Sequence, residues 1–360
     1  MNDGTQRLVD AIVAKRQIEL PFFLRAVEGS EALATELARA FDAVDAGRPL
    51  YVSGTSQSAA VCNDLGVPAD ARTRVEDNSR SEVLRVAALI DADYDAVVGI
   101  GGGRPIDVAK AAALVAGVPV VTVPTQLSAD GIASPIAVIR EQNGSVVSER
   151  SALPAAVVAD LHTLTNAPID FARAGIGDLI SNHTALTDWR IAAEDTGEEV
   201  DDFAALLASC ATLLVEGLDL SPVAEGRLTT DLARRLLDGL VLSGLAMEIA
   251  GSSRPCSGSE HLISHALDRL QPGMAEHGKQ VAFGTLVAAK LQGEDASSIA
   301  DLLRSAGIEG PLSGFGLADE RLIEAVRVAP TTRPGRYTVL DRLRPTNDQL
   351  LELLAEIRSN

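Results

Sequence analysis

The apolar positions along the chain follow two different periods, and the change falls near residue 166. Before it, short apolar runs typical of buried strands alternate with stretches that have one apolar face at helical spacing. Strands are expected at residues 49–54, 73–75, 96–100, 118–124 and 156–159, with a hairpin at 136–147. Strands that alternate with helices predict a parallel sheet covered by crossover helices.

After residue 166 the pattern is helical throughout. Several of these stretches are apolar on almost every side, as helices buried inside an all-helical domain are. They are expected at residues 186–193, 201–214, 229–249, 260–270 and 278–291. The break at Asn166-Ala167-Pro168 therefore predicts an α/β domain at residues 1–166 and an all-α domain at residues 167–360.

Two turns in the first half are candidates for a nucleotide site. The strand at 96–100 ends in Gly101-Gly102-Gly103, and a helix follows at once. Such glycines let the backbone approach a pyrophosphate, whose charge the helix N-terminus stabilises, although glycines also serve plain tight turns. The strand at 118–124 leads into residues 125–135, a loop rich in hydroxyl groups at the sheet edge where ligands bind in open α/β folds. An Asx-turn at Asp130 is compatible with that role.

Three of the five histidines lie within seventeen residues in the second half. His261 and His265 are four residues apart, so they share one face of a helix. His277 follows a Gln-Pro-Gly break, and it should begin a second helix that folds back on the first. Imidazole is the commonest protein ligand of metals, so the cluster indicates a metal site, although core or surface histidines would give the same spacing. Asp178, after Gly177, has the pattern of a helix N-cap.

Composition narrows the class of protein. The chain carries 31 basic and 50 acidic residues, a net charge of −19, which argues against non-specific binding to nucleic acid or anionic membranes. No apolar run reaches the length of a membrane span, and residues 3–19 carry scattered charges rather than the apolar core of a signal peptide. Cys62, Cys210 and Cys256 are too few and too far apart for a disulfide framework. We expect a soluble, cytoplasmic protein without membrane insertion.

Six motifs together resemble the sn-glycerol-1-phosphate dehydrogenase family, which belongs to the iron-containing alcohol dehydrogenase and dehydroquinate synthase-like superfamily. In chain order, between residues 95 and 340, they are GGGRPIDVAK, PTQLSADGIASP, AGIGDLISNHTALTDWR, GSSRPCSGSEHLISHALD, EHGKQVAFGT and RPGRYTVL. The resemblance implies a dehydroquinate synthase-like fold. A Rossmann-like domain for NAD or NADP would then precede a helical domain that binds metal and substrate.

The resemblance also implies which residues act. Metal ligands of the family correspond to Asp178, His261 and His277, and substrate or catalytic contacts correspond to Asp130, Asp178 and His265. The implied cofactor contacts are Gly102, Gly103, Arg104, Pro105, Ile106, Asp107, Thr125, Gln126, Leu127, Ser128 and Ser134. The implied reaction is the metal-dependent interconversion of dihydroxyacetone phosphate and sn-glycerol 1-phosphate, a step of phospholipid synthesis, by a homo-oligomer. Two imidazoles and a carboxylate suit zinc first, with nickel or iron as alternatives.

Departures from the family pattern leave alternatives open. Ala129 stands where the family usually has histidine, so a dehydrogenase of another small polyol or hydroxy-phosphate is the runner-up. Residues 54–56 lack the acid that holds a ribose 2′-hydroxyl, so neither NAD nor NADP is favoured. A sugar-phosphate cyclase, which is a lyase, is disfavoured because that branch has a lysine-rich site and this chain has four lysines. A substrate phosphate needs cations, for which the candidates are Arg254, Lys279, Arg333 and Arg336.

Overall fold

The computed structural model describes residues 23–143 and 146–359, which divide into two compact units. Unit 1 takes up the described residues of Met1–Thr125, Gly131–Leu164 and Met247–Gly251. Unit 2 takes up those of Gln126–Asp130, Thr165–Ala246 and Ser252–Asn360. Residues 3–19 and the start of the second hairpin strand, Gly144 and Ser145, lie outside the described residues. The domain limits of 1–166 and 167–360 stay a prediction.

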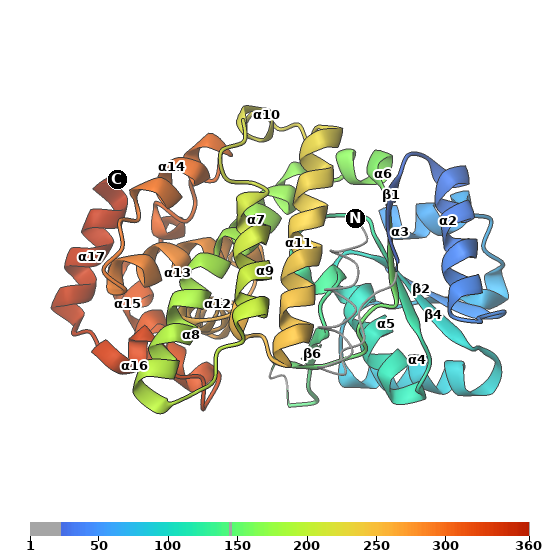
Figure 1. Cartoon of the computed structure of the whole chain (residues 1–360), viewed down its shortest axis with the longest axis horizontal. Coiled ribbons are helices and arrows are strands. Elements are labelled where there is room, and N and C mark those ends of the chain that lie inside the picture. The colour runs from blue at the N-terminus through green and yellow to red at the C-terminus, as the bar shows by residue number, and fades with distance from the viewer. Residues whose placement is uncertain (1–22, 144–145, 360) are drawn as a thin grey trace. The chain divides into compact units, whose positions relative to one another are not determined.

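A six-stranded sheet forms the centre of unit 1, and the paired strands in it are all parallel (Figure 1). Its order is β1-β8-β5-β4-β2-β3. The strands are β1 (Phe23–Val27), β2 (Pro49–Ser53), β3 (Arg72–Arg74), β4 (Ala96–Gly101), β5 (Val120–Pro124) and β8 (Ala156–Asp160). The predicted parallel α/β fold is confirmed, as is the antiparallel hairpin of β6 (Ile136–Arg140) and β7 (Val146–Arg150). The edge strand β1 is not predicted from the pattern.

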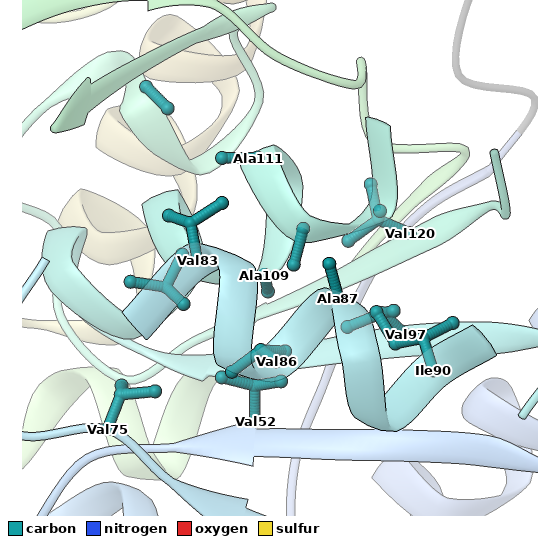
Figure 2. Close-up of a cluster of buried hydrophobic side chains, with 14 of the residues drawn as sticks. Val52, Val75, Val83, Val86, Ala87, Ile90, Val97, Ala109, Ala111 and Val120 are labelled. Carbon is teal, nitrogen blue, oxygen red and sulfur yellow. The ribbon is translucent and has the colours of Figure 1, made fainter. Parts of the chain in front are cut away.

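Alternate residues of the strands face opposite layers of helices. The covering helices are α2 (Ser30–Ala43), α3 (Gln57–Asp64), α4 (Arg80–Asp93) and α5 (Gly103–Ala116). Val97 of β4 lies in an apolar cluster with side chains of α4 and α5, which Figure 2 shows. Its neighbour Val98 lies in a second cluster, with side chains of α2 and α3. Both faces of the sheet are therefore buried, which explains why β4 is apolar without alternation.

The turn after β4 lies at the point where the order of the strands reverses. Strand β2 continues to β3 on one side, and β4 continues to β5 on the other, so ligands are expected at the carboxyl ends of β2 and β4. The turns after these strands are adjacent, because a Cβ on Gly54 would lie 3.9 Å from Cγ of Pro105. Gly101 has a φ of +148°, and a side chain there would collide with Pro105. Glycine is therefore required where the chain leaves β4 for α5.

Unit 2 is built of helices, which confirms the predicted all-helical second half. They include α7 (Ile169–Ile180), α8 (Asn182–Thr196), α9 (Asp202–Leu213), α10 (Ser221–Ala224), most of α11 (Thr230–Ala250), α12 (Ser259–Leu270) and α13 (His277–Leu291). Further helices that lie outside the expected ranges, as the short α10 does, are α14 (Ser297–Ser305), α15 (Asp319–Val328), α16 (Val339–Leu343) and α17 (Asn347–Ser359). Over the described part of the chain, no helix combines the length and apolar content needed to cross a membrane.

Lys110 is a fully buried cation that ties α5 to the chain after β5. Its Nζ donates to the carbonyl oxygens of Gly131 at 2.7 Å and Ser134 at 3.1 Å, and lies 3.4 Å from Oδ1 of Asp107. Oδ2 of Asp107 accepts from the backbone N–H of Val138 at 3.2 Å. Burial raises the pKa of Asp107, while Lys110 and that N–H lower it. Lys110 and Asp107 together fix the loop after β5 relative to α5.

We expect the substitution Lys110→Met to lower the free energy of unfolding by about 3–5 kcal/mol, because it leaves Asp107 as an unpaired buried charge. Denaturant unfolding followed by circular dichroism measures the loss. Lys290→Met is the control, because Lys290 pairs with an exposed Glu356 at 3.0 Å and its loss should cost about 1 kcal/mol or less. If both substitutions lowered the free energy of unfolding by the same amount, the role of Lys110 as the partner of the buried Asp107 would be contradicted.

Candidate functional site

The helices α7, α12 and α13, which Figure 1 labels, each supply one potential metal ligand. Asp178 lies near the end of α7, His261 in the first turn of α12, and His277 at the start of α13. Nε2 of His261 is 3.5 Å from Oδ1 of Asp178, and Nε2 of His277 is 3.8 Å from the same oxygen. Donors about 2.1 Å from a tetrahedrally coordinated ion are about 3.4 Å from one another, so these three atoms fit around one ion.

Glycines allow the three helices to approach this closely. On α7 and α13, Gly177 and Gly278 face each other, and a Cβ on Gly177 would collide with the carbonyl of Gly278. Farther along α13, a Cβ on Gly284 would lie 2.7 Å from Cα of Glu260 in α12. Gly177, Gly278 and Glu260 are each adjacent in sequence to one of the three ligands. Contacts between main chains therefore set the distances between the ligands.

The structure contradicts the local prediction for Asp178 and confirms the one for His277. The prediction that Asp178 caps a helix N-terminus is wrong, because Asp178 lies inside α7, two residues before the last residue, Ile180. Gly177 marks a close helix contact and not a helix start. The prediction for His277 is confirmed, because α13 begins there and packs on α12.

His261 is held between two carboxylates. Its Nδ1 is 3.1 Å from Oε1 of Glu260, and its Nε2 points toward Asp178. Burial lowers the pKa of His261, but the hydrogen bonds to Asp178 and Glu260 outweigh it and raise that pKa to about 10. Glu260 is itself fixed, because its Oε2 accepts from Oγ1 of Thr184 at 3.0 Å. The hydrogen bond to Glu260 thus holds a proton on Nδ1 of His261. Nε2 is then the atom that faces a metal, which would replace the proton on that nitrogen.

His277 is oriented by a chain of polar side chains. Oγ of Ser264 donates to Oε1 of Gln280 at 3.0 Å, so it accepts from Nδ1 of His277 at 3.2 Å. The amide of Gln280 is fixed in turn by its donation to Oδ1 of Asp268 at 2.8 Å. Burial and the charge of His261 lower the pKa of His277. Donation from Nδ1 to Ser264 leaves the lone pair of the neutral ring on Nε2, which is the form that binds a metal.

Besides Asp178, the two other predicted substrate residues, His265 and Asp130, lie beside these potential ligands. The ring centroid of His265 is 6.5 Å from that of His261 and 6.1 Å from that of His277. Burial, followed by the electrostatic effect of protonating His277 or His261, brings the pKa of His265 well below its usual range. The backbone N–H of Asp130 donates to Oδ2 of Asp178 at 3.0 Å, which joins the loop at residues 126–130 to α7.

The predicted cofactor residues fall in both units. Gly102 is the N-cap of α5, and the residues from Gly103 to Asp107 form the first turns of that helix. The backbone N–H of Thr125 donates to the carbonyl of Gly101 at 2.9 Å, and the side chains of Ile106 and Asp107 are buried. Ser134 also belongs to unit 1, whereas Gln126, Leu127 and Ser128 belong to unit 2. In unit 1 the helix N-terminus therefore offers mainly backbone N–H groups, and the cofactor roles stay predictions.

Comparisons with known proteins find a matching family model, similar sequences and a similar fold. Residues 42–168 match the model of the family described as iron-containing alcohol dehydrogenase. A glycerol-1-phosphate dehydrogenase (NAD(P)+) of Hyperthermus butylicus is 44% identical over 68% of this chain and 69% of its own. One of Methanothrix thermoacetophila is 37% identical over 90% of this chain and 92% of its own. The solved structure of a probable glycerol dehydrogenase from Sinorhizobium meliloti has a TM-score of 0.73 at 24% identity, covers 94% of this chain and 97% of its own, and shows the shared fold.

Substituting Gly278→Ala should push α7 away from α13, because the new Cβ would meet the main chain of α7. We expect the free energy of unfolding to fall by about 2 kcal/mol or more. Bound metal per chain, measured by inductively coupled plasma mass spectrometry, should fall as well. Gly47→Ala is the control, because its Cβ would make an ordinary contact at 3.7 Å with Asp95. A Gly278→Ala variant with unchanged stability and metal content would refute the role of the glycine contact.

Proposed function

The chain belongs to the glycerol-1-phosphate dehydrogenase family, and we propose that it interconverts dihydroxyacetone phosphate and sn-glycerol 1-phosphate with NAD(P)H and a bound divalent metal. The observation that carries this proposal is the cluster of Asp178, His261 and His277, whose donor atoms lie within 4.8 Å of one another. Two relatives that match most of the chain carry that activity in their names. Metal and NAD(P) are also in keeping with the iron-containing alcohol dehydrogenase family.

The donor set supports zinc as the metal, with nickel or iron as alternatives. Two imidazole nitrogens and one carboxylate oxygen give three protein ligands, and a catalytic site of this type keeps further positions open for substrate. When bound, the metal supplies a Lewis acid for the carbonyl oxygen of the substrate and NAD(P)H supplies the hydride. The hydrogen bonds of Glu260 and Ser264 keep both imidazoles in the orientation that such an ion needs.

The remaining residues of the cluster orient the substrate and move a proton. Reduction of the ketone places one proton on the former carbonyl oxygen. His265 is held neutral by burial and by its charged neighbours. A neutral imidazole can donate from one ring nitrogen while it accepts at the other, so we assign His265 to this transfer and to hydrogen bonding of the substrate. We assign Asp130 to the substrate as well, on a loop that Asp178 holds in place.

The turn after β4 is the site we propose for the cofactor's pyrophosphate. The N-terminus of α5, from Gly102 to Asp107, presents backbone N–H groups and the positive end of a 14-residue helix. Thr125 and Ser134 of the same unit are further proposed contacts, and the cofactor roles of Gln126, Leu127 and Ser128 stay predictions from the family resemblance. Residues 54–56 carry no acid for a ribose 2′-hydroxyl, so we propose that both NAD and NADP are accepted.

Cysteine usage supports a reducing compartment. Cys62, Cys210 and Cys256 are free thiols in the structure, and we propose a cytoplasmic location on that basis. The proposed partner is a small phosphorylated substrate. Assembly into a homo-oligomer stays a prediction.

The first prediction of this function is an activity. Purified protein supplied with zinc, nickel or iron and with NADH or NADPH should oxidise the nicotinamide when dihydroxyacetone phosphate is added. The loss of nicotinamide absorbance measures the rate, and failure of an sn-glycerol-3-phosphate-specific enzyme to consume the product checks its configuration. Unphosphorylated dihydroxyacetone and other polyols are the comparison substrates, and a preference for one of them would favour the alternative that Ala129 leaves open. If no metal and cofactor pair gives reduction, the substrate assignment is wrong.

The second prediction concerns the ligands. His261→Ala should remove one of three ligands, so the dialysed protein should retain far less than one metal ion per chain and lose its dehydrogenase activity. Inductively coupled plasma mass spectrometry measures the bound metal per chain. His183→Ala is the matched control, because His183 lies at the surface of unit 2 and pairs with Glu294 at 2.7 Å. Stoichiometric metal in the His261→Ala protein would refute the ligand assignment.

A further inference from the structure

Two arginines of unit 2 donate to one buried serine, Ser253, and a third arginine follows that serine in the chain. Arg254 and Arg336 are 4% and 8% exposed, Arg333 is half-buried, and we call these three residues the arginine cluster. Nη1 of Arg333 donates to Oγ of Ser253 at 2.7 Å, and Nη2 of Arg336 donates to the same oxygen at 3.0 Å. Two like-charged groups thus share a single neutral acceptor.

The charge of the arginine cluster is only partly balanced. Arg254 forms a two-pronged ion pair with Glu198, with Nε 2.7 Å from one carboxylate oxygen. Across the part of the chain that the structure describes, no carboxylate oxygen lies within the 4.0 Å ion-pair distance of Arg333 or Arg336. Arg336 donates otherwise to the carbonyl of Ser257. Two guanidinium charges therefore remain without an anion in direct contact.

Burial makes this arrangement costly without an anion. Burial, and then the charges of Arg333 and Arg254, lower the pKa of Arg336 to about 9, although the smaller effects of Glu198 and Glu260 act the other way. Burial and Arg254 likewise lower the pKa of Arg333. Buried charge that is left uncompensated is strongly destabilising, so a site of this kind is suited to an anionic ligand.

The arginine cluster borders the proposed substrate residue His265. Arg333 directly follows the short helix η5 (Ala329–Thr332), which packs on α12. Oγ1 of Thr332 donates to the carbonyl of Leu262 at 3.5 Å, one turn from His265. The charge of Arg333 is among those that lower the pKa of His265. A ligand bound by Arg333 would therefore lie next to the ring that is proposed to contact the substrate.

The four cationic candidates for binding a substrate phosphate differ in whether a carboxylate already pairs with them. Lys279 is paired with Asp170 at 2.6 Å, and Arg254 is paired with Glu198. Arg333 and Arg336 keep guanidinium groups without a carboxylate partner among the described residues. A guanidinium fork matches two oxygens of a phosphate, which a single ammonium group cannot do.

We propose that Arg333 and Arg336 bind the phosphate monoester of the substrate, with Ser253 holding the two guanidinium groups together and Arg254 fixed by Glu198 behind them. This assignment rests on the proposed function, because it places the phosphate of dihydroxyacetone phosphate beside His265. The arginine pair then distinguishes a phosphorylated ketone from an unphosphorylated one. Binding energy from the phosphate, which does not react, orients the carbonyl group at the ligand cluster.

Calorimetric titration of the metal-loaded full-length protein with inorganic phosphate and with sn-glycerol 1-phosphate tests the assignment. We expect the wild-type protein to bind both, with sn-glycerol 1-phosphate displacing inorganic phosphate. Arg333→Gln should bind each roughly 10- to 100-fold more weakly, because a hydrogen-bonded charge pair is lost. Arg333→Lys, which keeps the charge and loses the fork, should fall between the two. The KM for dihydroxyacetone phosphate should rise in the same order.

Arg190→Gln is the matched control, because Arg190 is an exposed arginine of α8 in the same unit, and its loss should leave both affinities unchanged. Metal content and melting temperature establish that the Arg333 variants are folded; Arg333 is chosen because Arg336 is more deeply buried. Unchanged phosphate affinity in Arg333→Gln would overturn the assignment. Failure of sn-glycerol 1-phosphate to displace inorganic phosphate from the wild-type protein would overturn it as well. If the wild-type protein reduces dihydroxyacetone phosphate and Arg333→Gln has the same KM, the arginine assignment fails and the function stands. If Arg333-dependent phosphate binding is present without that reduction, the anion site stands and the function fails.

Discussion

The contact between the main chains of α7 and α13 at Gly177 and Gly278 is the constraint on which the geometry of unit 2 depends. A metal site tolerates errors of about 0.2 Å in its bond lengths, whereas long side chains alone can vary by much more. Here the proposed ligands Asp178 and His277 follow and precede those glycines directly, so backbone packing sets their separation. The hydrogen bonds of Glu260 and Ser264 then need only to fix ring orientation.

The sequence predicts an element of the fold well where packing gives all of its residues one consistent pattern of burial. Strand β4 is apolar in every position because helices cover both faces of the sheet, and its limits follow from the sequence. Strand β1 is missed because it is a five-residue edge strand with Arg25 at its centre, and its partner β8 lies some 130 residues later in the chain. The helices after residue 296 are missed because three of the four have ten residues or fewer, too short for a sustained period.

The candidate site is less visible to local reasoning. Helical spacing places His261 and His265 on one face, but it cannot say which of them meets a ligand from another helix. Glycine has two uses, so Gly177 suggests a helix start while the structure shows a close helix contact; only the family resemblance leads to Asp178. The residues that orient the rings, Glu260 and Ser264, act through partners on α8 and α13, and no spacing rule connects them.

The distribution of regular and irregular structure in unit 2 has a consequence for how this chain can diverge. The three proposed metal ligands lie in α7, α12 and α13, and the glycines of α7 and α13 admit no larger residue without moving a backbone. Ala129 lies instead in the loop after β5, and Arg333 and Arg336 lie in the irregular segment between η5 and α16. On the proposed assignments, mutations in these segments would alter which hydroxy compound is accepted and would leave the geometry of the metal site unchanged. Related enzymes can therefore share one catalytic centre and still differ in the molecules on which they act.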